Sequence, residues 1–116
     1  MKFLSLFIST ISCATITLTD SSNGSISAKL NDVIIVRLSG SGNANPSNVW
    51  TAPTSSNPSA VKSVFSSATY DGGAQAFFTV SASGSSTISA QNACKPAPGK
   101  ICNFAIRLWS VNINAS

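Results

Sequence analysis

Short runs of alternating apolar residues, separated by Ser, Asn, Gly and Pro, recur along this chain. In residues 33–39 the side chains of Ile34, Val36 and Leu38 share one face, and residues 74–82 alternate in the same way. Alternation with a period of two is typical of half-buried strands. No helical periodicity recurs beyond residue 14. The pattern therefore predicts an all-β fold.

The spacing of the strands narrows the fold class further. The ranges that we interpret as strands are 15–19, 25–30, 33–39, 49–52, 60–66, 74–82, 85–91 and 101–113. Long Ser/Asn/Gly/Pro connections follow residue 39 and residue 52, and Asp71-Gly72-Gly73 marks a turn. Short strands at this spacing indicate an immunoglobulin-like antiparallel β-sandwich of seven to eight strands.

The last of these strands changes phase along its length. Ile106 and Leu108 share one face, whereas Trp109 and Val111 take the opposite phase. A β-bulge at about Trp109–Ser110 would account for the change. The phase leaves open whether Trp109 belongs to the core or forms an exposed platform.

The beginning of the chain has the features of a secretory signal. Lys2 precedes an uncharged, mostly apolar run from Phe3 to Ala14, which ends in small residues. Twelve residues are too few to span a bilayer as a helix, which takes about 20. We therefore expect residues 1–14 to be a signal peptide cut after Ala14, and residues 15–116 to be one secreted domain without a membrane anchor.

Two cysteines remain after that cut, Cys94 and Cys102, since Cys13 leaves with the signal. An even number suits an oxidising compartment, and we predict that they form a disulfide. The bond would close a nine-residue stretch between two strands. It would either pin a floppy hairpin or present the loop from Lys95 to Lys100 as a rigid surface, because rigid loops lose less entropy on binding.

Composition argues against several classes of function. The chain contains no His, and its three acidic residues are Asp20, Asp32 and Asp71, far apart in the sequence. Acid–base, metal and nucleophilic catalysis need convergent His, carboxylate or thiol groups, so we expect neither an enzyme nor a cofactor or metal site. The net charge is +4, but the basic residues are scattered, and nucleic-acid binding needs a dense patch.

Three connections of the predicted sandwich emerge at the same end, and their residues resemble a known family. Asn45-Pro46-Ser47-Asn48 precedes Trp50, Gly72-Gly73 precedes Phe77 and Phe78, and Lys95-Pro96 lies in the third connection. In this order and spacing, the chain resembles the chagasin-type inhibitors of papain-like cysteine peptidases. The motifs match in part: Lys95 stands where the family has Arg, and the family's Thr-Gly and third-loop Trp are missing.

The resemblance implies a secreted, monomeric, reversible inhibitor of papain-like cysteine peptidases. Its three loops would block the active-site cleft by shape, with Ser47 near the catalytic Cys, Gly72-Gly73 on one side and Lys95-Pro96 on the other. The alternative is a secreted adhesion, cell-wall or carbohydrate-binding module, since fold does not fix function. Trp109 or Tyr70 exposed on a flat sheet face would favour that module, and a ridge of three converging loops would favour the inhibitor.

Overall fold

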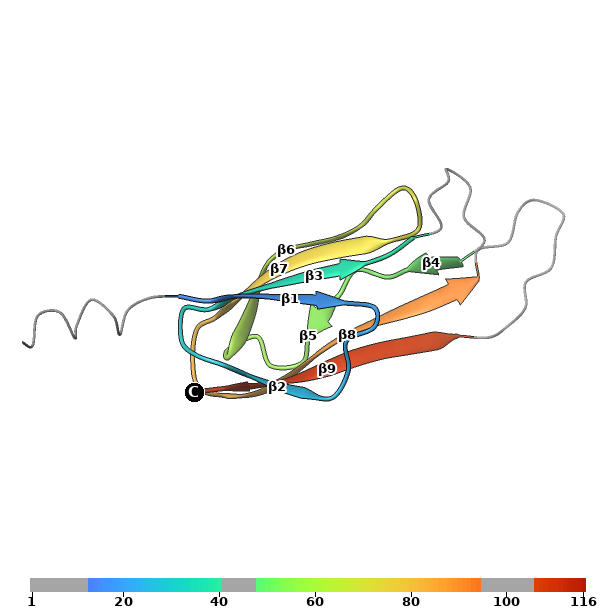
Figure 1. The fold of residues 1–116 in the computed structure, drawn as a ribbon. Helices are drawn as coiled ribbons and strands as arrows, with labels where there is room; N and C mark the ends of the chain where they lie inside the picture. Colours follow the sequence, from blue (N-terminus) through green and yellow to red (C-terminus); the bar gives the residue numbers. More distant parts are fainter. Residues whose placement is uncertain (1–12, 41–47, 95–105) are drawn as a thin grey trace, which may run out of the picture.

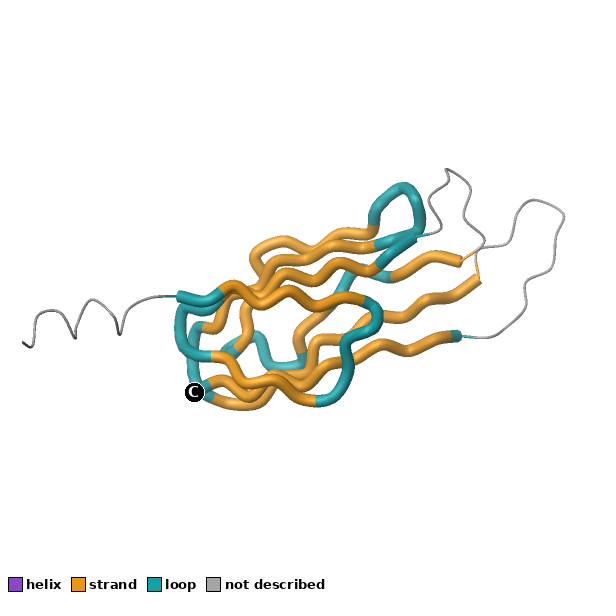
Figure 2. The backbone as a smooth tube through the Cα atoms, in the orientation of Figure 1, coloured by secondary structure: helices purple, strands orange, loops and turns teal. Residues whose placement is uncertain are grey.

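Two β-sheets face each other, and every regular element that the structure describes is a strand (Figures 1 and 2). It is a computed structural model, which describes residues 13–40, 48–94 and 106–116. The strands are β1 (Thr15–Thr19), β2 (Ser25–Ala28), β3 (Val33–Leu38), β4 (Asn48–Trp50), β5 (Thr54–Ser55), β6 (Val61–Ala68), β7 (Ala74–Val80), β8 (Gly84–Cys94) and β9 (Arg107–Ala115). None of the described residues belongs to a helix long and apolar enough to cross a membrane.

The strands divide into sheet A, in the order β1-β3-β7-β6, and sheet B, in the order β2-β9-β8-β4 with β5 also on β8. The sandwich fold that the sequence predicts is thus confirmed. Two pairs are parallel, β1 with β3 and β2 with β9, so the sheets are mixed rather than purely antiparallel. Parallel strands need a crossover connection rather than a hairpin, and β2 in sheet B lies within the connection between β1 and β3.

The core lies between the inner faces of the two sheets. Sheet A contributes the predicted faces of β3 and β7, with Ile34, Val36 and Phe78 fully buried. Sheet B contributes Trp50 together with Ile88 and the buried face of β9. Alternation therefore identified the buried face correctly in β3 and β7, whose side chains oppose each other directly in register.

The bulge predicted in the last strand is wrong. Pairing of β8 with β9 runs without interruption from Gly84↔Ala115 to Asn92↔Arg107. Trp109 is buried, and the residues that continue its face are buried with it. Ile106 and Leu108, which share the other face, are 60% and 73% exposed. The phase changes because apolar residues occupy outward-facing positions near the beginning of β9, and not because a bulge interrupts the strand.

Two smaller differences concern β5 and β6. The two-residue β5 lies within the connection predicted after residue 52, where it pairs with Ser89 and Ile88. An irregularity does occur in the described strands, between Ser63 and Phe65 of β6. The predicted signal peptide lies outside the described residues apart from Cys13 and Ala14.

Candidate functional site

The strand ends that bear the three predicted loops meet at one end of the sandwich, which we call the loop end (Figure 1). It consists of the end of β3, the beginning of β4, the β6–β7 connection of residues 69–73, the end of β8 and the beginning of β9. Two ladder pairs join these ends directly, Asn48↔Cys94 and Asn92↔Arg107. The bases of the first and third loops are thus neighbours in sheet B.

Trp50 connects all three loop bases. Its backbone N–H donates to the carbonyl oxygen of Gly72 in the β6–β7 connection, with an N···O distance of 2.9 Å. Its indole Nε1 donates to the carbonyl oxygen of Ser39, 3.1 Å away at the start of the first loop. The guanidinium carbon of Arg107 lies 5.6 Å from the centre of the ring, within cation–π range. One buried side chain in sheet B therefore ties both sheets together at the loop end.

Asp71 shapes the β6–β7 connection. Its carboxylate oxygen Oδ1 accepts hydrogen bonds from the Thr69 hydroxyl and from the backbone N–H of Gly73, the latter over 3.1 Å. The Thr69 hydroxyl first, and then the Gly73 N–H, lower the pKa of Asp71 from its ordinary value of 3.8. These bonds favour the charged form, because hydrogen bonds donated to a carboxylate stabilise it. Asp71 therefore remains ionised and holds the turn in mildly acidic as well as neutral solution.

The two glycines that follow Asp71 have different physical roles. Gly72 has a φ of 90°, which glycine adopts without the steric penalty that a side chain would bring. A Cβ on Gly73 would lie 2.5 Å from the carbonyl oxygen of Leu38, and one on Gly40 would collide with the carbonyl oxygen of Asp71. The backbones after β3 and before β7 therefore touch, which fixes the first two loop bases against each other.

The side chain that projects from the β6–β7 connection is Tyr70. It is 85% exposed, whereas Gly72 and Gly73 are buried. The role of Gly72 and Gly73 in a peptidase-binding loop stays a prediction. In the structure both glycines are buried, and Tyr70 is the most exposed side chain of this connection.

Several predicted site residues lie outside the described part of the chain. These are Asn45, Pro46, Ser47, Lys95, Pro96 and Cys102. Asn48 begins β4 and Cys94 ends β8, so the described chain carries the two stretches that contain these residues to the loop end. The Cys94–Cys102 disulfide stays a prediction.

Neither aromatic residue of the alternative module lies on an open sheet face. Trp109 is 5% exposed, and its Nε1 donates to the carbonyl oxygen of Thr19 over 3.0 Å. Tyr70 is exposed, but in a turn. An exposed aromatic pair does occur on sheet A, where the rings of Phe65 and Phe77 are 6.1 Å apart and tilted by 56°. Tilted rings do not form the flat platform that the alternative requires.

The connecting role of Trp50 was missed in the sequence, where Trp50 appears only as the residue that follows the first loop. Gly40 was missed too, because it stands in a Ser/Gly-rich stretch that resembles any loop. Across residues 13–40, 48–94 and 106–116, no three His, Cys, Asp or Glu side chains gather as a metal site would require.

By sequence, the chain matches no protein-family model and no curated protein. By fold, it is similar to the crystal structure of EhICP2, a cysteine protease inhibitor from Entamoeba histolytica, with a TM-score of 0.62 and 15% identity. That match covers 90% of this chain and 97% of the inhibitor. It is also similar to the solution structure of amebosin, with a TM-score of 0.52 and 16% identity over 89% of this chain and 98% of amebosin. At these identities the likeness establishes that the chain has the fold of a cysteine protease inhibitor.

Proposed function

We propose that this protein is a secreted, reversible inhibitor of papain-like cysteine peptidases and that its three loops block the active-site cleft. The observation that carries the proposal is the convergence of the three loop bases on Trp50, at one end of a fold similar to that of EhICP2. An adhesion or glycan-binding module would need an exposed flat face rather than a fixed set of loop bases.

Inhibition would occur by occupation of the cleft, without a covalent bond. The stretch Asn45–Asn48 would enter beside the catalytic Cys, with Tyr70 on one flank and Lys95-Pro96 on the other. Loops held at their bases lose little conformational entropy on binding, so more of the contact energy appears as affinity. The bonds from Trp50 and Asp71 supply that restraint at the loop end.

The proposal is tested by titrating residues 15–116 into papain and related peptidases with a fluorogenic peptide substrate. We expect stoichiometric inhibition that dilution reverses and that leaves the chain uncleaved. Lys95→Ala should weaken inhibition, whereas Lys62→Ala serves as a matched control, because Lys62 is an exposed lysine on β6 of sheet A. Absence of inhibition across the panel would overturn the proposal, as would equal effects of the two lysine variants.

Secretion and the disulfide form a second part of the proposal. Cleavage after Ala14 would release a chain that begins at Thr15, and oxidation would join Cys94 to Cys102. The mass of the secreted protein, with and without thiol alkylation, tests both. Reduction should weaken inhibition, because the third loop must then be ordered on contact at a cost of about 0.5–1.5 kcal/mol per immobilised side chain. Two alkylated thiols in the untreated protein would refute the disulfide.

A further inference from the structure

Two apolar side chains, one just before β9 and one near its beginning, are largely exposed to solvent. Leu108 is 73% exposed and Ile106 is 60% exposed, although Trp109 beside them is buried. Elsewhere on β9 the outward positions hold polar residues, such as Ser110, Asn112 and Asn114. Exposed apolar side chains that gather in one place mark interaction sites more often than scattered ones do. The apolar part of this outer face is therefore confined to the loop end.

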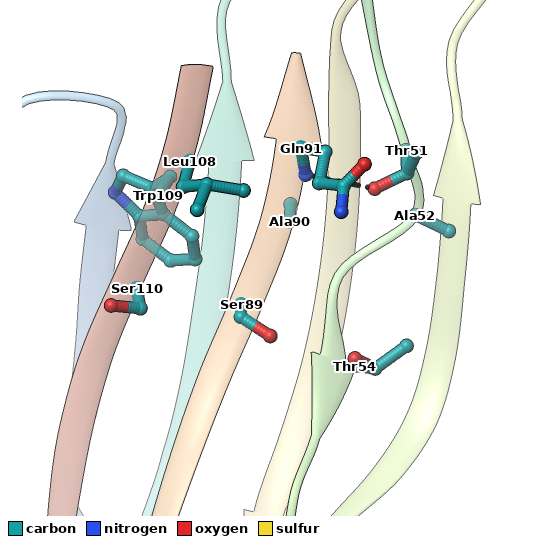
Figure 3. Close-up of a pocket in the computed structure, with 9 residues that line it drawn as sticks. All are labelled: Thr51, Ala52, Thr54, Ser89, Ala90, Gln91, Leu108, Trp109 and Ser110. Carbon is teal, nitrogen blue, oxygen red and sulfur yellow. Dashed lines mark hydrogen bonds between the residues drawn. The ribbon is translucent and has the colours of Figure 1, made fainter. Parts of the chain in front are cut away.

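Leu108 also lines a shallow groove of about 550 Å³ on sheet B. Figure 3 shows Leu108 on one side, Thr51 and Thr54 on the other, and Ser89 and Gln91 between them. The far wall is fixed to β8 by two bonds: the Thr51 N–H donates to the Gln91 carbonyl over 2.8 Å, and the Gln91 N–H donates to Thr51 Oγ1 over 3.0 Å. The groove is therefore a formed feature of the sheet.

The chemistry of the groove selects the kind of surface that would fit it. Its lining residues carry hydroxyl, amide and apolar groups and no charged side chain. Such a lining does not balance a charge brought in by a partner, since burying an unpaired charge is costly. It suits an uncharged segment that presents an apolar side chain to Leu108 and hydrogen-bonding groups to the hydroxyls opposite.

We propose that Ile106, Leu108 and this groove form a second contact surface for the peptidase, beside the loops. The occupant would be an uncharged segment at the rim of the peptidase cleft, with an apolar side chain seated against Leu108. This inference rests on the proposed function. It is argued from continuity: Ile106 immediately precedes β9, and Leu108 pairs with Gln91 one step beyond the Asn92↔Arg107 pair at the loop end. A peptidase that covers the loops would therefore lie close to these residues on sheet B.

The test compares an exposed apolar residue in the groove of sheet B with one on sheet A, away from the groove. Leu108→Ser removes the apolar wall of the groove, and Val64→Ser changes an exposed residue on β6 of sheet A, which is 63% exposed. Inhibition constants are measured against papain and the same panel of related peptidases, with thermal melting of each variant as a check on folding. We expect Leu108→Ser to raise the inhibition constant at least about tenfold, as loss of a well-packed contact residue does, and Val64→Ser to leave it unchanged within about twofold.

The outcomes separate the two proposals. If the wild-type chain inhibits and Leu108→Ser behaves like Val64→Ser, the second contact surface is refuted while the proposed function stands. If the wild-type chain inhibits none of the peptidases, the proposed function fails and this inference fails with it. If Leu108→Ser melts at the wild-type temperature and Leu108→Met restores inhibition, an apolar contact at this position is established.

Discussion

The two ends of the sandwich differ in the length of their connections and in the hydrogen bonds that hold them. At the end opposite the loops, short turns join the strands and backbone hydrogen bonds hold them. The Asn31 N–H donates to the carbonyl oxygen of Val80 over 2.8 Å, and the Val80 N–H donates to the backbone carbonyl oxygen of Asp32 over 3.0 Å. At the loop end, Trp50 and Asp71 instead fix the bases of longer connections. The first end is thus closed by short turns, whereas the second holds the bases of the loops that we propose as the binding surface.

An aspartate caps a turn at each end, and the two carboxylates can be compared directly. Asp32 is buried and accepts the N–H groups of Lys29 over 2.9 Å and of Ala14 over 3.0 Å. The bond from Lys29 first, and then that from Ala14, lower the pKa of Asp32 from 3.8. Asp71 caps its turn in the same chemical way, but beside the exposed Tyr70. Removal of Asp32 should therefore affect stability, and removal of Asp71 should affect binding.

The largest effect on both stability and inhibition is expected from Trp50→Ala. Truncation of a buried Trp leaves a cavity and costs about 3–5 kcal/mol of unfolding free energy. It also removes the indole bond to Ser39 and the surface under Arg107, so inhibition should fall as well. Urea unfolding and titration against papain measure the two effects. A loss below about 1 kcal/mol would contradict the connecting role of Trp50.

Asp32→Ala should destabilise the fold without changing the loops. In a chain that retains Ala14, two part-buried N–H groups lose a charged acceptor, and a hydrogen bond to a charged group contributes about 1.5–3 kcal/mol. Because folding lowers the pKa of Asp32, its contribution is present well above pH 3.8 and is lost as the pH falls through the lower folded-state value. The difference in stability between wild type and variant should therefore shrink in acid. A large change in the inhibition constant at equal folded concentration would argue against separate roles for the two ends.

The position at which the proposed signal peptide is cut should have a smaller effect, at the end opposite the loops. Ala14 donates to Asp32, and its carbonyl accepts the Val33 N–H over 3.0 Å. A chain that begins at Ala14 should therefore be more stable than one that begins at Thr15, by about 0.5–1.5 kcal/mol for each bond kept. Thermal melting of the two chains side by side measures the difference. Equal melting temperatures would mean that these bonds contribute nothing measurable.

Asp71→Ala should have the smallest effect on stability of these changes and a clear effect on binding. Thr69 and the Gly73 N–H lose their acceptor, so the turn that carries Tyr70 is no longer fixed. We expect the inhibition constant to rise severalfold while the melting temperature stays close to that of the wild type. Asp71→Asn keeps an acceptor oxygen and should restore part of the affinity. If Asp71→Ala lowered the melting temperature and left the inhibition constant unchanged, the proposed division of roles between Asp32 and Asp71 would be wrong.

The sequence pattern alone was sufficient to predict the strands in which apolar and polar residues alternate, because alternation shows that one face of the strand is buried. The buried faces of β3 and β7 follow from their sequences, and the predicted start of β1 at Thr15 agrees with the structure. The parallel pairing of β1 with β3 could not be predicted, because alternation says which face is buried and not which strand lies alongside. The short β5 was missed because two residues carry no periodic signal.

The location of the candidate site could be predicted from the sequence, but the contacts that hold its loop bases could not. Turn residues indicated where the loops lie, and the order of strands indicated that they converge. The bonds from Trp50 to Ser39 and Gly72 join residues that are distant in the sequence, and only the folded chain brings them together. Leu108 misled the prediction of a bulge because alternation alone does not show whether an apolar side chain is buried or exposed.

The central claim is that a peptidase binds the loop end and leaves the opposite end untouched. Amide hydrogen exchange of the chain, with and without a saturating amount of papain or another inhibited peptidase, tests it most directly. We expect added protection in residues 69–73 and 106–108 and none in residues 29–32, which close the opposite end. Protection confined to residues 29–32, or spread over the outer face of sheet A around Phe65 and Phe77, would contradict it.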